Sequence, residues 1–126
     1  MVISRKIALI EDDEAIRMMY KFKLEKSGFE VYEASNGKEG LEVIETNHPD
    51  LILLDLKMPV MSGDEMLQEL RKTKSGAEIR VIILTNVSKD EAPQSLRLLN
   101  VDRYIVKAHY TPNQVIDIIE SVLGKN

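Results

Sequence analysis

Five short apolar segments, separated by amphipathic stretches of helical period, limit the possible folds of this chain more than any other feature. Each segment is rich in Ile, Val or Leu and has the length of one strand. They are KIALI (6–10), EVYEA (30–34), LILLD (51–55), RVIIL (80–84) and RYIV (103–106). Strands that alternate with helices pair in parallel, because each helix returns the chain to the same end of the sheet. We therefore predict an α/β fold, a doubly wound five-stranded parallel sheet with helices on both faces.

Helix-start signals support this pattern in four of the stretches between the segments. In each, a residue that can cap a helix is followed three residues later by Glu or Gln. The pairs are Asn36 with Glu39, Ser62 with Glu65, Ser88 with Glu91, and Thr111 with Gln114, the last with Pro112 at the favoured first position. Apolar faces at helical spacing are predicted for the first helix (Ala15, Met18, Met19, Phe22) and the last (Val115, Ile118, Ile119, Val122). Gly28 is expected to end the first helix.

Length and composition exclude several classes of protein. The 126 residues suit one domain, so we expect a single domain over residues 1–126 and no output domain. The absence of cysteine excludes disulfides, thiolate metal sites and a cysteine nucleophile. No apolar run is long enough for a membrane span or a signal peptide, so we expect a cytoplasmic protein. The net charge of −4, with scattered Lys and Arg, argues against direct nucleic-acid binding.

Polar residues follow four of the predicted strands at their carboxyl ends. Glu11, Asp12 and Asp13 follow the first strand, Asp55 ends the third, Thr85 and Asn86 end the fourth, and Lys107 follows the fifth. In an open parallel sheet these ends share one edge, and ligands bind in the crevice there. We therefore expect one functional site that gathers groups far apart in the sequence.

The acidic residues of this site point to a divalent cation. Asp12, Asp13 and Asp55 would lie close together, and two unit charges about 4 Å apart repel by roughly 4 kcal/mol at an effective dielectric near 20. Lys107 alone does not offset that repulsion. Carboxylates with a backbone carbonyl suit Mg²⁺ better than Ca²⁺, while protonation of the crowded acids is the alternative. We predict an Mg²⁺ site, with Glu11 as a solvated or lysine-paired neighbour.

Four of these motifs together resemble those of a known family. The segments IEDDE, LLDLKMPVMSG, ILTN and YIVK resemble, in order and spacing, the receiver domain of two-component response regulators. The resemblance covers essentially the whole chain. It implies a flavodoxin-like fold with strand order 2-1-3-4-5. In that family the loop after Asp55 turns sharply around Met58, Pro59 and Gly63, exposes the carboxylate and starts a helix.

The resemblance also implies a phosphoacceptor site. Asp55 would accept a phosphoryl group from a histidine kinase, a phosphotransfer protein or a small acyl phosphate. Asp12 and Asp13 resemble the acidic pair that holds Mg²⁺, and the backbone carbonyl of Lys57 resembles a further ligand. Such a chain is a regulatory phosphoacceptor and no separate enzyme, because it catalyses only its own phosphorylation and dephosphorylation.

A conformational switch is implied by three further residues. Lys107 resembles the lysine that pairs with the phosphoryl group, and Thr85 resembles the hydroxyl that moves to hydrogen-bond it. Tyr104 resembles the aromatic residue that turns inward as Thr85 shifts. The movement changes the face formed by the fourth strand, the fourth helix, the fifth strand and the last helix, where a downstream protein partner would bind.

Two positions depart from the family pattern. Ala108 follows Lys107 where many receivers have proline, so we expect a trans peptide or an altered loop. Asn86 is larger than the residue usually found beside Thr85, and we expect it to narrow access to the phosphoryl group.

Three other functions compete with this one. A haloacid-dehalogenase phosphatase needs a second Asp where Lys57 stands, and a flavodoxin-like nucleotide binder needs phosphate donors where EDDE stands. A receiver-like protein-interaction module that works without phosphorylation stays open as the alternative.

Overall fold

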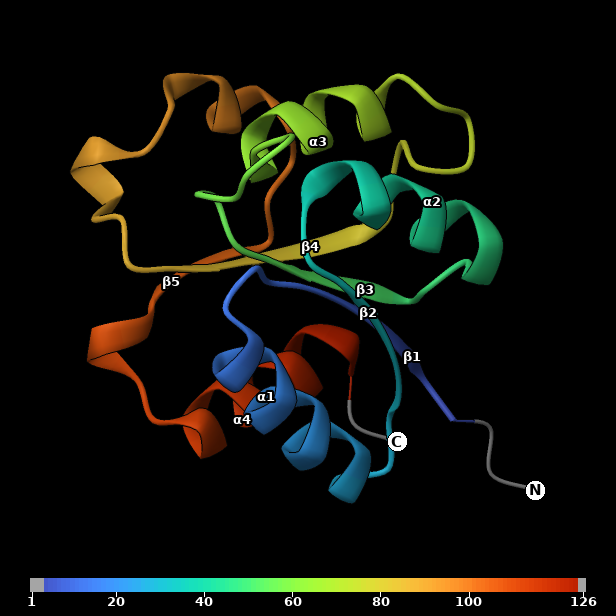
Figure 1. Cartoon of the computed structure of the whole chain (residues 1–126), viewed down its shortest axis with the longest axis vertical. Helices are drawn as coiled ribbons and strands as arrows, with labels where there is room; N and C mark the ends of the chain where they lie inside the picture. Colours follow the sequence, from blue (N-terminus) through green and yellow to red (C-terminus); the bar gives the residue numbers. More distant parts are fainter. Residues whose placement is uncertain (1–3, 125–126) are drawn as a thin grey trace.

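A parallel sheet of five strands forms the centre of the computed structural model, which describes residues 4–124 (Figure 1). The strands are β1 (Lys6–Ile10), β2 (Glu30–Ala34), β3 (Leu51–Leu54), β4 (Arg80–Thr85) and β5 (Arg103–Val106). Their order across the sheet is β2-β1-β3-β4-β5, and all four pairings are parallel. The predicted fold class and strand order are confirmed.

Helices cover both faces of this sheet, as Figure 1 shows. One face carries α1 (Glu14–Lys26) and α4 (Pro112–Leu123), and the other carries α2 (Gly37–Asn47) and α3 (Gly63–Arg71). Three short 3-10 helices complete the regular structure of the described residues: η1 (Lys89–Glu91), η2 (Gln94–Leu98) and η3 (Lys107–His109).

Two apolar cores result, one on each side of the sheet. Successive side chains of a strand point to opposite faces, so Ala8 and Ile10 of β1 join the core under α2 and α3. Ile7 and Leu9 join the core under α1 and α4. The four residues of β3 are buried on both sides, which holds the carboxyl ends of β1 and β3 rigidly side by side.

The predicted caps are confirmed for three of the helices. The side chain of Asn36 accepts a hydrogen bond from the amide of Glu39, and Ser62 and Thr111 each form a reciprocal capping box. Gly28 lies two residues after the end of α1 with a φ of +97°, a left-handed conformation that glycine adopts without steric cost. It ends the first helix as predicted.

The helix predicted after Ser88 does not form as an α-helix. Ser88 precedes η1, its hydroxyl contacts the carboxylate of Glu91, and its side chain caps no backbone amide. Pro93 explains the difference: at the fifth position of such a helix it lacks the needed N–H and its ring clashes with the preceding turn. Two short 3-10 helices, η1 and η2, take the place of one longer helix.

The predicted apolar face of α1 is wrong for Ala15, Met18 and Phe22, which are exposed, whereas Met19 packs against the core as predicted. Met18 and Phe22 are 59% and 65% exposed, while Tyr20 and Leu24 are buried against the sheet. Helix α1 carries two apolar stripes at helical spacing, and the position of its first turn on the sheet decides which one is buried. The prediction for the last helix is confirmed, with Ile116 added to its buried face.

Candidate functional site

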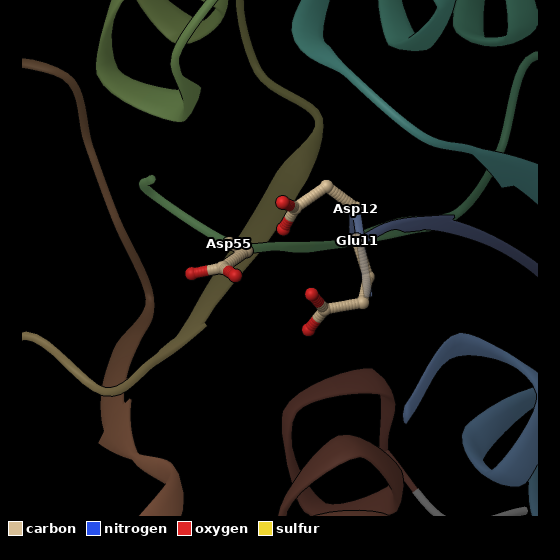
Figure 2. A group of neighbouring side chains, drawn as sticks. All are labelled: Glu11, Asp12 and Asp55. Atoms are coloured by element: carbon tan, nitrogen blue, oxygen red, sulfur yellow. The ribbon is translucent and has the colours of Figure 1, made fainter. Parts of the chain in front are cut away.

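Three carboxylates meet at the carboxyl ends of β1 and β3. Glu11, Asp12 and Asp55 each offer one oxygen, and these oxygens all lie within 4.8 Å of one another. Figure 2 shows the three side chains projecting into the same region of the molecule from these two strand ends. The grouping follows from strand pairing, because Ile10 of β1 is in register with Leu54 of β3. The next residues, Glu11 and Asp55, are therefore neighbours.

Asp13 lies outside this group of three acids, although it lines the same cleft, and its role as a metal ligand stays a prediction. The side chain of Asp13 accepts a hydrogen bond from the amide of Ile16 at 2.9 Å and caps α1. Asp13 directly precedes the first residue of α1, which is the position of a helix cap. Glu11 directly follows β1, and its side chain points into the site. Glu11 and Asp12 are the two acids after β1 that join Asp55 in this group.

Lys107 joins two of the acids. Its ammonium nitrogen lies 2.5 Å from an oxygen of Glu11 and 3.3 Å from an oxygen of Asp55. Glu11 is only 3% exposed, and burial raises its pKa although the bond from Lys107 opposes that shift. Burial by itself would lower the pKa of Lys107, but the bonds and charges of Glu11 and Asp55 outweigh it, and the pKa is raised. The prediction that Glu11 is lysine-paired is confirmed, and Glu11 is also a member of the acidic group.

Asp55 is held at the end of β3 with its carboxylate facing the site. The residue is 7% exposed, and one oxygen accepts a hydrogen bond from the amide of Leu56 at 2.7 Å. Gly63 lets the start of α3 pack against this segment, because a Cβ there would overlap the carbonyl oxygen of Asp55. The amide of Gly63 also donates to the carbonyl of Leu56. The predicted sharp loop after Asp55 is confirmed, and its backbone is fixed by α3.

A strained turn lies within this loop. Val60 has a φ of +68°, and the amide of Met61 donates to the carbonyl of Pro59 at 2.7 Å. A β-branched residue in the left-handed region is unusual, because its Cβ approaches the backbone. Its side chain is 77% exposed, so apolar packing gives little compensation.

Thr85 and Tyr104 contact the same short segment after β4. The hydroxyl oxygen of buried Thr85 accepts a hydrogen bond from the amide of Val87 at 3.3 Å. The hydroxyl of Tyr104 donates to the carbonyl of Val87 at 2.7 Å. Burial, followed by the charges of Asp55 and Glu91, raises the pKa of Tyr104. Both predicted switch residues therefore bond to the backbone of the same residue, Val87.

The predicted site residues line one open cleft of about 510 Å³, with Tyr104 as the exception. The cleft residues that were singled out from the sequence are Glu11, Asp12, Asp13, Asp55, Lys57, Thr85, Asn86 and Lys107. Tyr104 lines a separate surface hollow with residues of η1 and η2. The role of the Lys57 carbonyl stays a prediction.

The loop after Lys107 differs from a simple extended connection. Lys107 begins the 3-10 helix η3, and no cis peptide bond occurs within residues 4–124. The expectation of a trans peptide before Ala108 is confirmed.

The donor set of the acidic group suits a hard divalent cation. Three carboxylates within 4.8 Å supply oxygen ligands, and one ammonium group leaves part of their charge unbalanced. Oxygen donors of this kind bind Mg²⁺, which retains several waters. The group is able to hold a metal ion.

Among the described residues, no helix has the length and apolar character needed to cross a membrane.

Comparison with known proteins gives one consistent family. Residues 7–120 match the family described as response regulator receiver domain. The alkaline phosphatase synthesis transcriptional regulatory protein PhoP of Bacillus subtilis is 32% identical over 125 residues, which are 98% of this chain and 50% of that protein. The chain thus spans about half the length of the curated relatives it matches.

Solved structures give the same result over nearly their whole length. The chemotaxis protein CheY4 of Vibrio cholerae has a TM-score of 0.87 and 26% identity, covering 95% of this chain and 99% of that one. A CheY-like response regulator receiver domain protein of Methanospirillum hungatei has a TM-score of 0.86 and 31% identity, covering 96% and 94%.

Proposed function

The chain belongs to the response regulator receiver family of two-component signalling, and from this premise we propose that it accepts a phosphoryl group on Asp55. The donor is a histidine kinase, a phosphotransfer protein or a small acyl phosphate. The receiver domain is a regulatory phosphoacceptor module. Phosphorylation then alters a surface that a downstream protein recognises.

One observation carries this proposal: the nearly buried carboxylate of Asp55 faces an open cleft with Lys107 beside it. One Asp55 oxygen is engaged by the amide of Leu56 and the other by Lys107. A carboxylate fixed in this way can attack an in-line phosphorus atom with little loss of freedom. The attack forms the bond between the carboxylate oxygen and phosphorus, and the bond from phosphorus to the donor breaks.

The remaining cleft residues balance the charge of the transferred group. Glu11 and Asp12, with Asp55, would hold Mg²⁺, and the carbonyl of Lys57 would be a further ligand. The bound cation would neutralise phosphoryl oxygens and orient the donor. Lys107 would leave Glu11 or Asp55 and pair with the new phosphoryl oxygens. Thr85 would donate its hydroxyl proton to one of them.

The route to the surface passes through the segment after β4. Thr85 accepts the amide of Val87, and Tyr104 donates to the carbonyl of the same residue. If Thr85 turned toward a phosphoryl group, the position of Val87 and therefore the environment of Tyr104 would change. The hollow beside Tyr104, between η1, η2 and β5, would present that change to a partner.

Incubation with acetyl phosphate tests this function. We expect one phosphoryl adduct in the intact mass of the wild-type protein when Mg²⁺ is present and none after Mg²⁺ is removed by a chelator. The Asp55→Asn variant keeps the shape of the side chain but removes the nucleophile, so we expect no adduct. If wild-type protein gave none with acetyl phosphate, with histidine kinases or with the phosphoryl analogue beryllofluoride, the chain would instead act as a phosphorylation-independent interaction module.

A further inference from the structure

Arg17 connects helix α1 to the acidic turn and to β2. Its Nη1 donates to the backbone carbonyl oxygen of Glu11 at 2.9 Å, and its Nε lies 3.3 Å from a carboxylate oxygen of Glu33. The side chain is only 18% exposed. The guanidinium group is therefore held in one orientation by a strand on one side and by the acidic turn on the other.

The carbonyl that Arg17 contacts belongs to the peptide unit between Glu11 and Asp12. The amide of Glu11 is fixed separately, because it donates to the carbonyl of Ala34 in β2 at 3.0 Å. A peptide unit is planar, so fixing its oxygen also fixes the direction in which the chain continues to the Asp12 Cα. Rotation of this unit would turn the carboxylate of Asp12 away from Asp55.

We propose that Arg17 is a positioning residue for the divalent-cation site: by holding the Glu11–Asp12 peptide, it keeps both carboxylates directed at Asp55. This inference rests on the proposed function, because it concerns the same cation site. Arg17 itself contacts neither a reacting atom nor the cation. Partners of this kind, one bond beyond the metal ligands, commonly change metal affinity by about 10- to 100-fold when they are removed.

The sign of the effect separates positioning from simple electrostatics. Arg17 carries a positive charge beside the acidic turn, so its removal by Coulomb's law alone should tighten the binding of a cation. Loss of positioning should weaken the binding. A weaker affinity in an Arg17→Gln variant therefore reports the lost hydrogen bond, because loss of the positive charge alone would change the affinity in the opposite direction.

The measurement is a titration of the whole chain with Mn²⁺, followed by the electron paramagnetic resonance signal of the free ion, with Mg²⁺ as competitor. We expect Arg17→Gln to bind Mn²⁺ about tenfold more weakly than wild type. Arg17→Lys keeps the charge, but one ammonium group cannot reproduce the two-directional contact of a guanidinium. We expect the affinity of Arg17→Lys to lie between those of wild type and Arg17→Gln. If circular dichroism shows that Arg17→Gln does not fold, the affinity of Arg17→Lys tests the inference in its place.

Arg80→Gln is the matched control. Arg80 is also paired with an acid, Asp102 at 3.4 Å, but it begins β4, at the end of the parallel strands opposite to the acidic group, so the same substitution should leave Mn²⁺ affinity unchanged. Wild-type or tighter affinity in the Arg17 variants would overturn the inference while leaving the proposed function intact. Failure of wild-type protein to bind Mn²⁺ or Mg²⁺, together with the absence of an acetyl phosphate adduct, would overturn both.

Discussion

The ammonium group of Lys107 lies closer to Glu11, at 2.5 Å, than to the proposed phosphoacceptor Asp55, at 3.3 Å. Lys107 and Glu11 are 96 positions apart in the sequence. They meet because β1 and β5 end at the same edge of the sheet. A lysine shared between two acids lies within reach of a phosphoryl group if one forms on Asp55 as proposed. In the absence of a cation, the positive charge of Lys107 also reduces the repulsion between the crowded carboxylates.

The buried position of Glu11 predicts a distinct pH dependence of stability. Burial raises its pKa, so between the ordinary value of 4.5 and the raised value the folded chain binds more protons than the unfolded chain. The free energy of unfolding contributed by this group therefore falls as pH rises through that window. Glu11→Gln removes the titration. In chelator, urea unfolding should show that wild-type stability minus variant stability decreases as pH rises above about 4.5; an increase would contradict the burial argument.

Gly63→Ala should destabilise the loop that carries Asp55. A Cβ at this position would overlap the Asp55 carbonyl oxygen, and its nearest neighbours are all backbone atoms of Asp55 and Leu56, which cannot move aside as a flexible side chain could. We expect a loss of about 3 kcal/mol in the free energy of unfolding. Gly28→Ala is the control, because it meets no atom within 4 Å and introduces only left-handed strain, for which the loss should be about 1 kcal/mol. Equal losses in urea unfolding would refute the steric reason.

Val60→Asn should stabilise the protein. Val60 adopts a left-handed φ of +68° with an exposed side chain, and asparagine adopts this conformation at lower cost. We expect a gain of about 1 kcal/mol in thermal or urea unfolding. Leu98→Asn makes a similar exchange at a more exposed position outside the left-handed region, so it should give no gain. A loss of stability in Val60→Asn would show that the valine side chain has a packing role.

Pro93→Ala should increase helix content between Ser88 and Leu99. The substitution restores the missing N–H and removes the ring that separates η1 from η2. Far-ultraviolet circular dichroism should show more helix than in wild type. Pro112→Ala serves as the comparison, because Pro112 occupies the first turn of α4, where its N–H has no helical partner. No gain in Pro93→Ala would mean that tertiary contacts, and not the proline, hold this segment in 3-10 form.

Signals that depend on neighbouring residues in the sequence predicted most of the fold. Apolar segments gave the five strands, and capping pairs located the starts of three α-helices. The helix after Ser88 was predicted from a cap alone, although Pro93, five residues later, already argued against it. The buried face of α1 depends on how the helix sits on the sheet. Two apolar stripes at helical spacing do not settle that choice, which depends on tertiary packing.

Which of the three consecutive acids after β1 join Asp55 is not decided by the sequence pattern. Glu11, Asp12 and Asp13 are consecutive acids of similar chemistry, and only the end of β1 determines which two face Asp55. The strand register contained a usable signal: Glu11 follows Ile10 as Asp55 follows Leu54, and these two strand residues are partners. Arg17 was missed because its contact is with a backbone carbonyl, which has no signature in the pattern of side chains.

The position of the phosphoryl group is the decisive measurement. Protein treated with acetyl phosphate and Mg²⁺ would be reduced with borohydride, which converts an aspartyl phosphate to a stable alcohol, and then digested and sequenced by mass spectrometry. We predict modification at Asp55 alone, dependent on Mg²⁺ and abolished in Asp55→Asn. Modification at Asp12 or Asp13 in place of Asp55, or adduct formation that survives the Asp55→Asn substitution, would contradict the assignment of Asp55 as the phosphoacceptor.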